Sequence, residues 1–254
     1  MLRPRGPATR PVLFIQGGGA GAHDQWDDRL VASLSAALGK GWRVRYPRLP
    51  GEADPSYAGW APAIRAEILA SREAMKRDTR LLTGSPLPRG DKPLAVVGHS
   101  LGGTILAAAL AEEPPTVPLT AIVLVSAPFV GQGGWPESGF ALPADLGAKL
   151  PPRVPVYIFH GLADDTAPPA HADLWARAIP QAVVHKLPGR DHQLNDDLGE
   201  VAAVCGECAR APGRRRPGPG PAQARAAPPA AAIPPPAAAR CASRGSRSKW
   251  CQAR

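Results

Sequence analysis

The sequence predicts an α/β fold, with a mostly parallel sheet of about six strands and helices on both faces. Three observations carry this prediction. Short apolar runs alternate with helical patterns along residues 1–205, most of these runs are apolar throughout, and the segment is long enough for one sizeable core. Continuous apolar strands are typical of parallel sheets that helices cover on both sides. We therefore expect one α/β domain in residues 1–205.

The first strand and helix are expected within residues 12–39. Val12–Ile15 is a short apolar run that stops at three glycines, so it predicts a buried strand. Apolar residues recur at every fourth position from Trp26 to Leu38, which predicts a helix. Asp24 is its expected N-cap and Gly39 its C-terminal stop.

Residues 42–93 predict an edge strand, a second helix and a connection. Trp42–Tyr46 alternates between apolar and polar residues and ends at a proline, as edge strands do. Apolar residues spaced by four from Trp60 to Ile68 predict a helix that reaches about Arg72. Residues 78–93 are polar and contain proline and glycine, so they predict a connection.

The second half of the domain repeats the alternation of strands and helices. The expected strands are Leu94–Val97, Ala121–Val125, Val154–His160 and Ala182–Leu187. The expected helices are Leu101–Glu113, Ala172–Ile179 and a short pattern that begins at Asn195. Residues 130–153 are rich in glycine and proline and predict a loop.

A serine lies between one predicted strand and the next helix, in Gly98-His99-Ser100-Leu101-Gly102. This is the G-x-S-x-G pattern of a nucleophile elbow, a sharp turn that exposes a reactive serine. Glycines two positions before and after the serine avoid a clash where the strand and helix backbones approach closely. An ordinary glycine-rich turn is the alternative interpretation.

A nucleophilic serine needs a base and an orienting acid. After a nucleophile elbow they follow in the order Ser, Asp, His, each just past a later strand. Asp164 and Asp165 follow one predicted strand, and His192 follows the next. Because the carboxyl ends of parallel strands meet at one edge, we expect Ser100, an aspartate and His192 to lie together. Each residue alone would be an ordinary loop residue.

These motifs resemble those of the α/β-hydrolases, in the branch of small single-domain serine hydrolases. The resemblance covers about residues 10–204 and depends on VLFIQGGGAGAHDQW, VVGHSLGG, VYIFHGLADDTAPPAH and LPGRDHQLNDDL. It implies the α/β-hydrolase fold, with Ser100 as nucleophile and His192 as base. It also selects Asp164 as the acid, because the proline of the family motif follows four residues later. Ala167 stands where the family usually has valine.

The resemblance further implies an oxyanion hole. One donor is the N–H of Leu101, and the other comes from the loop after the first strand, for which we take Gly18 with Gly19 as the alternative. The insertion before Val154 is short, which implies a minimal cap and an open site. Side chains expected to line this site are Trp135, Phe129, His23 and Trp60. Core or lid packing is the alternative for each of them.

The resemblance implies a serine hydrolase that cleaves carboxylic esters, or related amide or thioester bonds, through an acyl-enzyme. It needs a small-molecule acyl substrate and no cofactor. Two alternatives from other classes remain. One is a non-catalytic binding protein with the hydrolase fold. The other is a dinucleotide-binding module that uses the Gly17–Gly19 loop, although the following strand ends in Tyr46-Pro47-Arg48 without the expected acid.

The net charge of +9 belongs to the tail of the chain. Residues 206–254 contain ten Lys and Arg against one acid, whereas residues 1–205 contain 20 of each sign. Such a tail binds polyanions through charge alone, so we predict no specific nucleic-acid partner. The histidines form no H-E-x-x-H motif and the four cysteines lack zinc-ribbon spacing, so we expect no metal.

We place the domain boundary near residue 205. Beyond it, Ala, Pro, Arg and Gly make up 37 of 49 residues, a composition that cannot bury enough surface to offset chain entropy. The tail is either a genuine disordered segment or the product of a shifted reading frame in GC-rich DNA. Neither a membrane span nor a secretory signal is recognisable, so we expect a cytoplasmic protein. The oligomeric state is not determined by these patterns.

Overall fold

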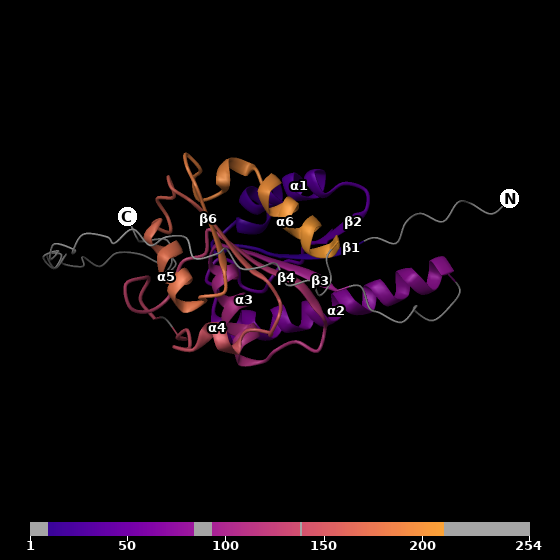
Figure 1. The fold of residues 1–254 in the computed structure, drawn as a ribbon, viewed down its shortest axis with the longest axis horizontal. Helices are drawn as coiled ribbons and strands as arrows, with labels where there is room; N and C mark the ends of the chain where they lie inside the picture. The colour runs from indigo at the N-terminus through magenta and orange to yellow at the C-terminus, as the bar shows by residue number, and fades with distance from the viewer. Residues whose placement is uncertain (1–9, 84–92, 138, 211–254) are drawn as a thin grey trace, which may run out of the picture.

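A computed structural model of the chain describes residues 10–83, 93–137 and 139–210. Its centre is a six-stranded sheet in the order β2-β1-β3-β4-β5-β6, in which every neighbouring pair is parallel (Figure 1). The strands are β1 (Arg10–Ile15), β2 (Trp42–Arg45), β3 (Leu94–His99), β4 (Leu119–Val125), β5 (Val156–Gly161) and β6 (Val183–Leu187). This confirms the predicted parallel sheet.

Helices cover both faces of the sheet (Figure 1). One face is covered by α1 (Asp27–Leu38) and α6 (Gly199–Arg210). The other is covered by α2 (Tyr57–Thr83), α3 (Ser100–Glu112), α4 (Leu146–Lys149) and α5 (Ala170–Ala178). Since α4 has only four residues, the described part of the segment between β4 and β5 forms a minimal cap.

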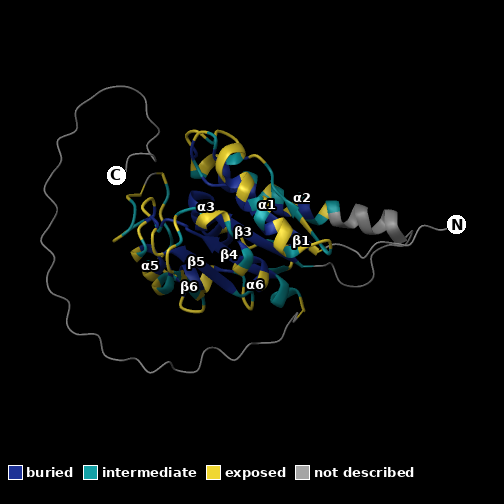
Figure 2. Ribbon diagram, turned by 90° about the horizontal axis from the view of Figure 1, so that it is seen from above, coloured by how far each residue is buried: buried dark blue, intermediate teal, exposed yellow. Residues whose placement is uncertain are grey.

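Each face of the sheet buries its own apolar cluster, because successive side chains of a strand point to opposite faces. On β1, Val12 and Phe14 join the cluster under α1 and α6, whereas Leu13 and Ile15 join the cluster under α2 and α3. The strands β3 and β5 are buried along their whole length (Figure 2). This double burial explains why their sequences are apolar throughout.

The start of the first helix differs from the prediction. A π-helical turn, η1 (Ala22–Trp26), precedes α1, and Asp24 pairs with Arg48 instead of capping the helix. A π turn is wider than an α turn, so it rotates the side chains that precede α1 out of helical phase. Trp26 is consequently 50% exposed, whereas Leu30, four residues later, is fully buried.

Two helices extend beyond their predicted ends. The second predicted helix continues to Thr83, into the expected connection. The last helix passes Cys205 and Gly206, where a stop was expected, and ends at Arg210. It continues because it packs along α1 and buries Val201 and Cys205. The predicted domain boundary therefore falls inside α6, and the tail from residue 211 lies outside the described residues.

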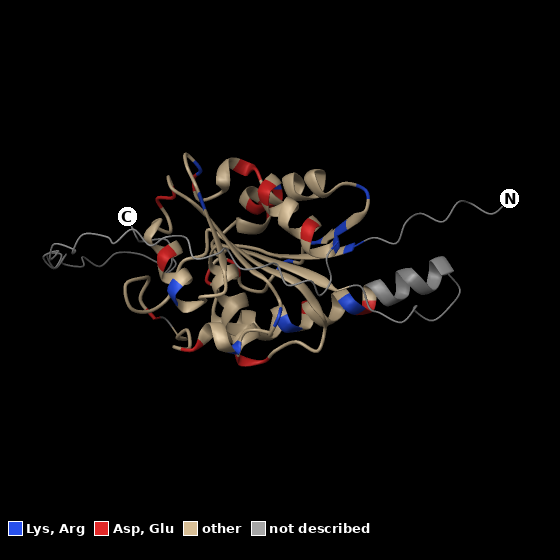
Figure 3. Cartoon of the chain, in the orientation of Figure 1, with Lys and Arg blue, Asp and Glu red and all other residues tan. Residues whose placement is uncertain are grey.

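Charged residues of both signs are spread over the described surface (Figure 3). This distribution fits the equal numbers of basic and acidic residues in residues 1–205. Within residues 10–83, 93–137 and 139–210, no helix combines the length and the apolar character needed to cross a bilayer.

Candidate active site

The turn between β3 and α3 holds Ser100 in a strained conformation. Its φ of 50° lies in the left-handed region, which is uncommon for a residue other than glycine. The neighbouring glycines are required by space: a Cβ on Gly98 would lie 2.6 Å from the Cα of Gly103, and one on Gly102 would lie 2.0 Å from the carbonyl oxygen of Gln16. The local sequence therefore permits the sharp elbow that exposes the serine hydroxyl.

The structure brings the three predicted residues together at the carboxyl edge of the sheet. His192 Nε2 lies 3.0 Å from Ser100 Oγ, and His192 Nδ1 lies 2.9 and 3.0 Å from the two carboxylate oxygens of Asp164. A carboxylate only accepts, so Nδ1–H donates to Asp164 and the bare Nε2 accepts from the serine hydroxyl. This is the arrangement in which an imidazole can take a proton from serine.

Asp164 is buried and held by its own loop. Its Oδ1 accepts hydrogen bonds from the backbone N–H groups of Thr166 and Ala167, at 2.9 and 2.8 Å. Burial alone would raise the pKa of the Asp164 carboxyl, but the hydrogen bond from His192 and these backbone donors outweigh it and lower the pKa below its usual value. The ionised carboxylate therefore orients the imidazole, while Asp165 stays exposed on the loop.

Behind this loop lies His160, which is fully buried. Its Nε2 donates to the carbonyl oxygen of Ala167 at 2.7 Å. Burial lowers the pKa of His160, so the ring is neutral and braces the loop without adding charge.

Gly161, at the end of β5, is a functional position that the sequence analysis missed. A Cβ there would lie 2.2 Å from the carbonyl oxygen of Arg190 and 2.5 Å from that of Asp191. The loop that carries His192 thus packs directly on the end of the strand that precedes Asp164. The sequence shows a glycine inside the H-G-x-x-D stretch. It does not show that the backbone of Arg190 and Asp191 packs against this glycine.

Two backbone N–H groups beside Ser100 are free to bind an anion. Leu101 lies in the first turn of α3, where N–H groups have no acceptor within the helix. In the glycine loop, Gly17 N–H donates to Asp27 at 2.6 Å and Gly19 N–H donates to the carbonyl oxygen of Glu52 at 2.7 Å. Gly18 packs against Leu101, and its N–H has no acceptor among the described residues.

A cavity of about 460 Å³ opens over Ser100. Beside Ser100, His192 and the glycine loop, its walls include Trp26, Trp135, Thr166 and Gln193. Trp135 was predicted to line the site, whereas Trp26 was expected in the core. The π turn before α1 accounts for this, because it directs Trp26 outward at the edge of the cavity.

The other predicted lining residues lie elsewhere. His23 stacks on Tyr46 with ring centroids 4.1 Å apart. Phe129 meets Trp175 edge to face at 5.2 Å. Trp60 is fully buried in the core under α2, and its indole N–H donates to the carbonyl oxygen of Pro50. These three side chains therefore pack in the core or against a loop and do not line the cavity.

In the described part of the chain, no group of three or more His, Cys, Asp or Glu side chains is placed to hold a metal ion. His160 and His171 bond to backbone groups, and His185 stacks on Phe159 at 4.4 Å.

The chain was compared with protein families and with known proteins. The model of the alpha/beta hydrolase family matches residues 12–245. The protein YheT of Escherichia coli (strain K12), which is named as a proposed esterase, is 54% identical over 41 residues, which is 16% of this chain and only 12% of YheT.

Among solved structures, Est1E from Butyrivibrio proteoclasticus is similar with a TM-score of 0.56 and 18% identity, over 81% of this chain and 90% of Est1E. The esterase domain of a Rhodothermus marinus protein has a TM-score of 0.52 and 20% identity, over 80% of this chain and 87% of that domain. At these identities the likeness shows a shared fold.

Proposed function

Because the chain belongs to the alpha/beta hydrolase family, we propose that it is a serine hydrolase that cleaves carboxylic esters of small and medium acyl groups. The observation that carries the proposal is the continuous line of contacts from Ser100 through His192 to Asp164, each 3.0 Å or shorter. YheT, matched over a short stretch, and the Rhodothermus marinus domain carry the word esterase in their name or title and support the same class of reaction.

The geometry supports an acyl-enzyme mechanism. Ser100 Oγ attacks the ester carbonyl while His192 Nε2 takes its proton, and Asp164 stabilises the imidazolium that forms. The N–H groups of Leu101 and Gly18 bind the oxyanion of the tetrahedral intermediate. His192 then protonates the leaving alcohol, and a water molecule activated by the same ring releases the acid.

The shape of the site supports a preference for short acyl chains. The only helix in the described segment between β4 and β5 is the four-residue α4, so no large cap extends the cavity of about 460 Å³. Trp26 and Trp135 supply apolar walls at its mouth, where an aromatic leaving group could pack. We therefore expect faster turnover of p-nitrophenyl butyrate than of the laurate ester.

The proposal is tested with a fluorophosphonate probe and p-nitrophenyl esters. Wild-type protein should be labelled on Ser100 and should hydrolyse the acetate and butyrate esters, and Ser100→Ala should lose labelling and on the order of 10⁴-fold or more in kcat. A wild-type protein that neither labels nor turns over any of these esters would instead favour the non-catalytic alternative. Faster hydrolysis of the laurate than of the butyrate ester would overturn the chain-length preference alone.

The dinucleotide-binding alternative has less support. It needs the N–H groups of the glycine loop to face a pyrophosphate. Those of Gly17 and Gly19 are already bonded to Asp27 and Glu52.

A further inference from the structure

A second aspartate–histidine pair, Asp27 and His99, lies next to Ser100. Asp27 is the first residue of α1 and His99 is the residue before Ser100, and both side chains are at most 2% exposed. His99 Nδ1 lies 2.9 Å from Asp27 Oδ1. In the described residues neither atom has a hydrogen-bond partner, the other atom included, so the contact is a close electrostatic one between two buried groups.

Each member of the pair also contacts a different loop of the site. The second carboxylate oxygen of Asp27 accepts a hydrogen bond from Gly17 N–H at 2.6 Å. The other ring nitrogen of His99, Nε2, donates to the backbone carbonyl oxygen of His192 at 3.2 Å. The pair therefore joins the glycine loop after β1, the elbow after β3 and the histidine loop after β6.

The surroundings of His99 define its protonation state. Both ring nitrogens face an oxygen that only accepts, and only the imidazolium has a proton on each nitrogen. Burial alone would lower the pKa of His99, but the charge and close contact of Asp27, together with the hydrogen bond to the His192 carbonyl, outweigh it and the pKa lies above its usual value. The two neighbouring oxygens and this shift both favour the imidazolium form of His99.

We propose that the Asp27–His99 ion pair positions the groups that perform the hydrolysis, by fixing the glycine loop and the His192 backbone relative to Ser100. This inference rests on the proposed esterase function. Every contact of the pair is close to a reacting group, because Gly17 precedes Gly18, His99 precedes Ser100, and His192 is itself the base. A displacement of about 1 Å at such groups can reduce turnover on the order of 10²-fold.

Stability alone does not explain such a pair. Replacing a buried ion pair with apolar residues of similar volume is often neutral or stabilising, so its presence is weak evidence of a role in folding. The position of this pair, between three loops that are distant in sequence, is what a positioning role requires. His99 and Asp27 are 72 positions apart, and His99 and His192 are 93 apart.

Two substitutions of His99 separate its contacts. The amide nitrogen of glutamine can replace Nε2 and keep the donor to the His192 carbonyl, whereas that of asparagine can replace only Nδ1 and keep the contact with Asp27. We expect His99→Asn to lower kcat for p-nitrophenyl butyrate on the order of 10²-fold with little change in KM, and His99→Gln to retain about tenfold more kcat than His99→Asn. Equal kcat values for the two variants, or values within about twofold of wild type, would overturn the proposal.

Two further variants control for the loss of a buried group. Asp27→Asn keeps an acceptor for Gly17 N–H but removes the negative charge, and should lower kcat at constant KM as well. His185→Asn removes another partly buried imidazole, stacked on Phe159 in β6, and should leave kcat within about twofold of wild type. Melting temperatures of all variants show that the comparison is made on folded protein. A fall in kcat for His185→Asn as large as that for His99→Asn would count against a specific role.

Nitrogen-15 NMR of the histidine rings tests the pair without any turnover. At pH 8.5, well above the usual histidine pKa of about 6.5, wild type should show one ring with both nitrogens protonated. This signal should vanish in Asp27→Asn and His99→Gln, and the His192 ring signals should shift more in His99→Asn than in His99→Gln.

The turnover measurements and the NMR measurements together distinguish the positioning role from the proposed function. No imidazolium in wild type, or unshifted His192 signals in His99→Asn, overturns the positioning role even if the protein is an esterase. Suppose instead that wild type is inactive, yet it shows the imidazolium and His99→Asn shifts the His192 signals. This result overturns the esterase proposal and retains the ion pair as the element that orders this edge of the sheet.

Discussion

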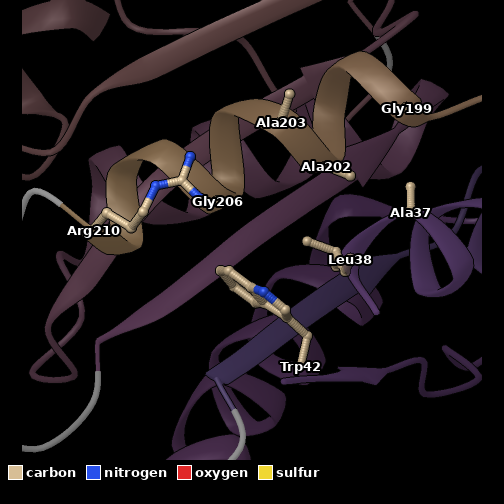
Figure 4. Close-up of a pocket in the computed structure, with 8 residues that line it drawn as sticks. All are labelled: Ala37, Leu38, Trp42, Gly199, Ala202, Ala203, Gly206 and Arg210. Atoms are coloured by element: carbon tan, nitrogen blue, oxygen red, sulfur yellow. The ribbon is translucent and has the colours of Figure 1, made fainter. Parts of the chain in front are cut away.

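The carboxyl and amino edges of the sheet are formed by the same six strands but hold very different groups. At the carboxyl edge, Ser100 adopts a left-handed backbone, and Asp164 is almost fully buried with polar partners. Toward the amino edge, a groove of about 250 Å³ runs between α1, α6 and the start of β2, and Trp42 faces small residues of α6 across it (Figure 4). Strained backbone and buried charge persist only where surrounding structure holds them, and Ser100 and Asp164 combine them at the edge where we propose that the chemistry takes place.

The largest expected effect concerns the acid at the carboxyl edge. Asp164→Asn should lower kcat about 10⁴-fold, because the amide would hold the wrong tautomer of His192. Asp165→Asn, one residue away and exposed, should change kcat by less than about threefold. Ester hydrolysis with purified variants measures both. Equal losses would show that the loop, rather than one carboxylate, is what catalysis needs.

A matched pair of glycines provides the second comparison. In Gly161→Ala the new methyl group must displace the backbone at Arg190 and Asp191, and with it His192, so kcat should fall on the order of 10²-fold. Gly41→Ala, before β2 at the amino edge, meets no atom within 4 Å and should leave kcat and the melting temperature nearly unchanged. Similar kcat values for both variants would contradict the close packing inferred at Gly161.

Lowering the pH should reduce the folding stability through a histidine at the carboxyl edge. His171 Nδ1 accepts the backbone N–H of Phe129 at 2.9 Å, which requires a neutral ring, and burial lowers the pKa of His171 to about 4. In the unfolded chain its pKa is about 6.5, so the unfolded state binds the proton more readily between these values. The stability from this group is present above pH 6.5 and is lost as the pH falls toward 4.

This dependence is measured as the melting temperature between pH 7.5 and 4.5. Asparagine can accept the same N–H without titrating, so His171→Asn should show a smaller fall in melting temperature than wild type. His160, whose pKa is also lowered by burial, leaves a residual fall of the same sign. An unchanged pH profile in His171→Asn would exclude His171 as its source.

The smallest effects on turnover are expected at the amino edge. Trp42→Ala should lower stability by about 1–2 kcal/mol through lost packing and leave kcat unchanged. A chain that ends at Arg210 should retain full esterase activity, and one that ends at residue 205 should melt earlier because it lacks the last turn of α6. A loss of kcat on removal of residues 211–254 would give the tail a role in the working enzyme.

Much of the fold and three residues of the site could be predicted because their signals are local. Continuous apolar runs identify buried parallel strands, and G-x-S-x-G, H-G-x-x-D and a loop histidine each follow such a run. Parallel pairing then places the three at one edge without further information. The position of Gly18 was open, and the bonds made by its two glycine neighbours now favour it over Gly19.

The errors arose where the backbone departs from regular periods. Trp26 was assigned to the helix by a spacing of four, and Asp24 was assigned as the N-cap before it. Both assignments hold only if the helix is regular from its first turn. The π turn of η1 broke that phase, so Trp26 reached the cavity and Asp24 reached Arg48. Periodicity identifies the buried stripe of a regular helix, and it cannot predict an irregular turn before it.

Residue order alone was enough for the alternation of strands and helices and for the order Ser100, Asp164, His192 after successive strands. Contacts between distant segments required folding in three dimensions. Asp27 meets His99, and Gly161 admits the loop before His192, because the sheet order brings the ends of β1, β3, β5 and β6 to one edge. Such contacts depend on which strands become neighbours, and no local pattern of residues specifies which distant segments come together.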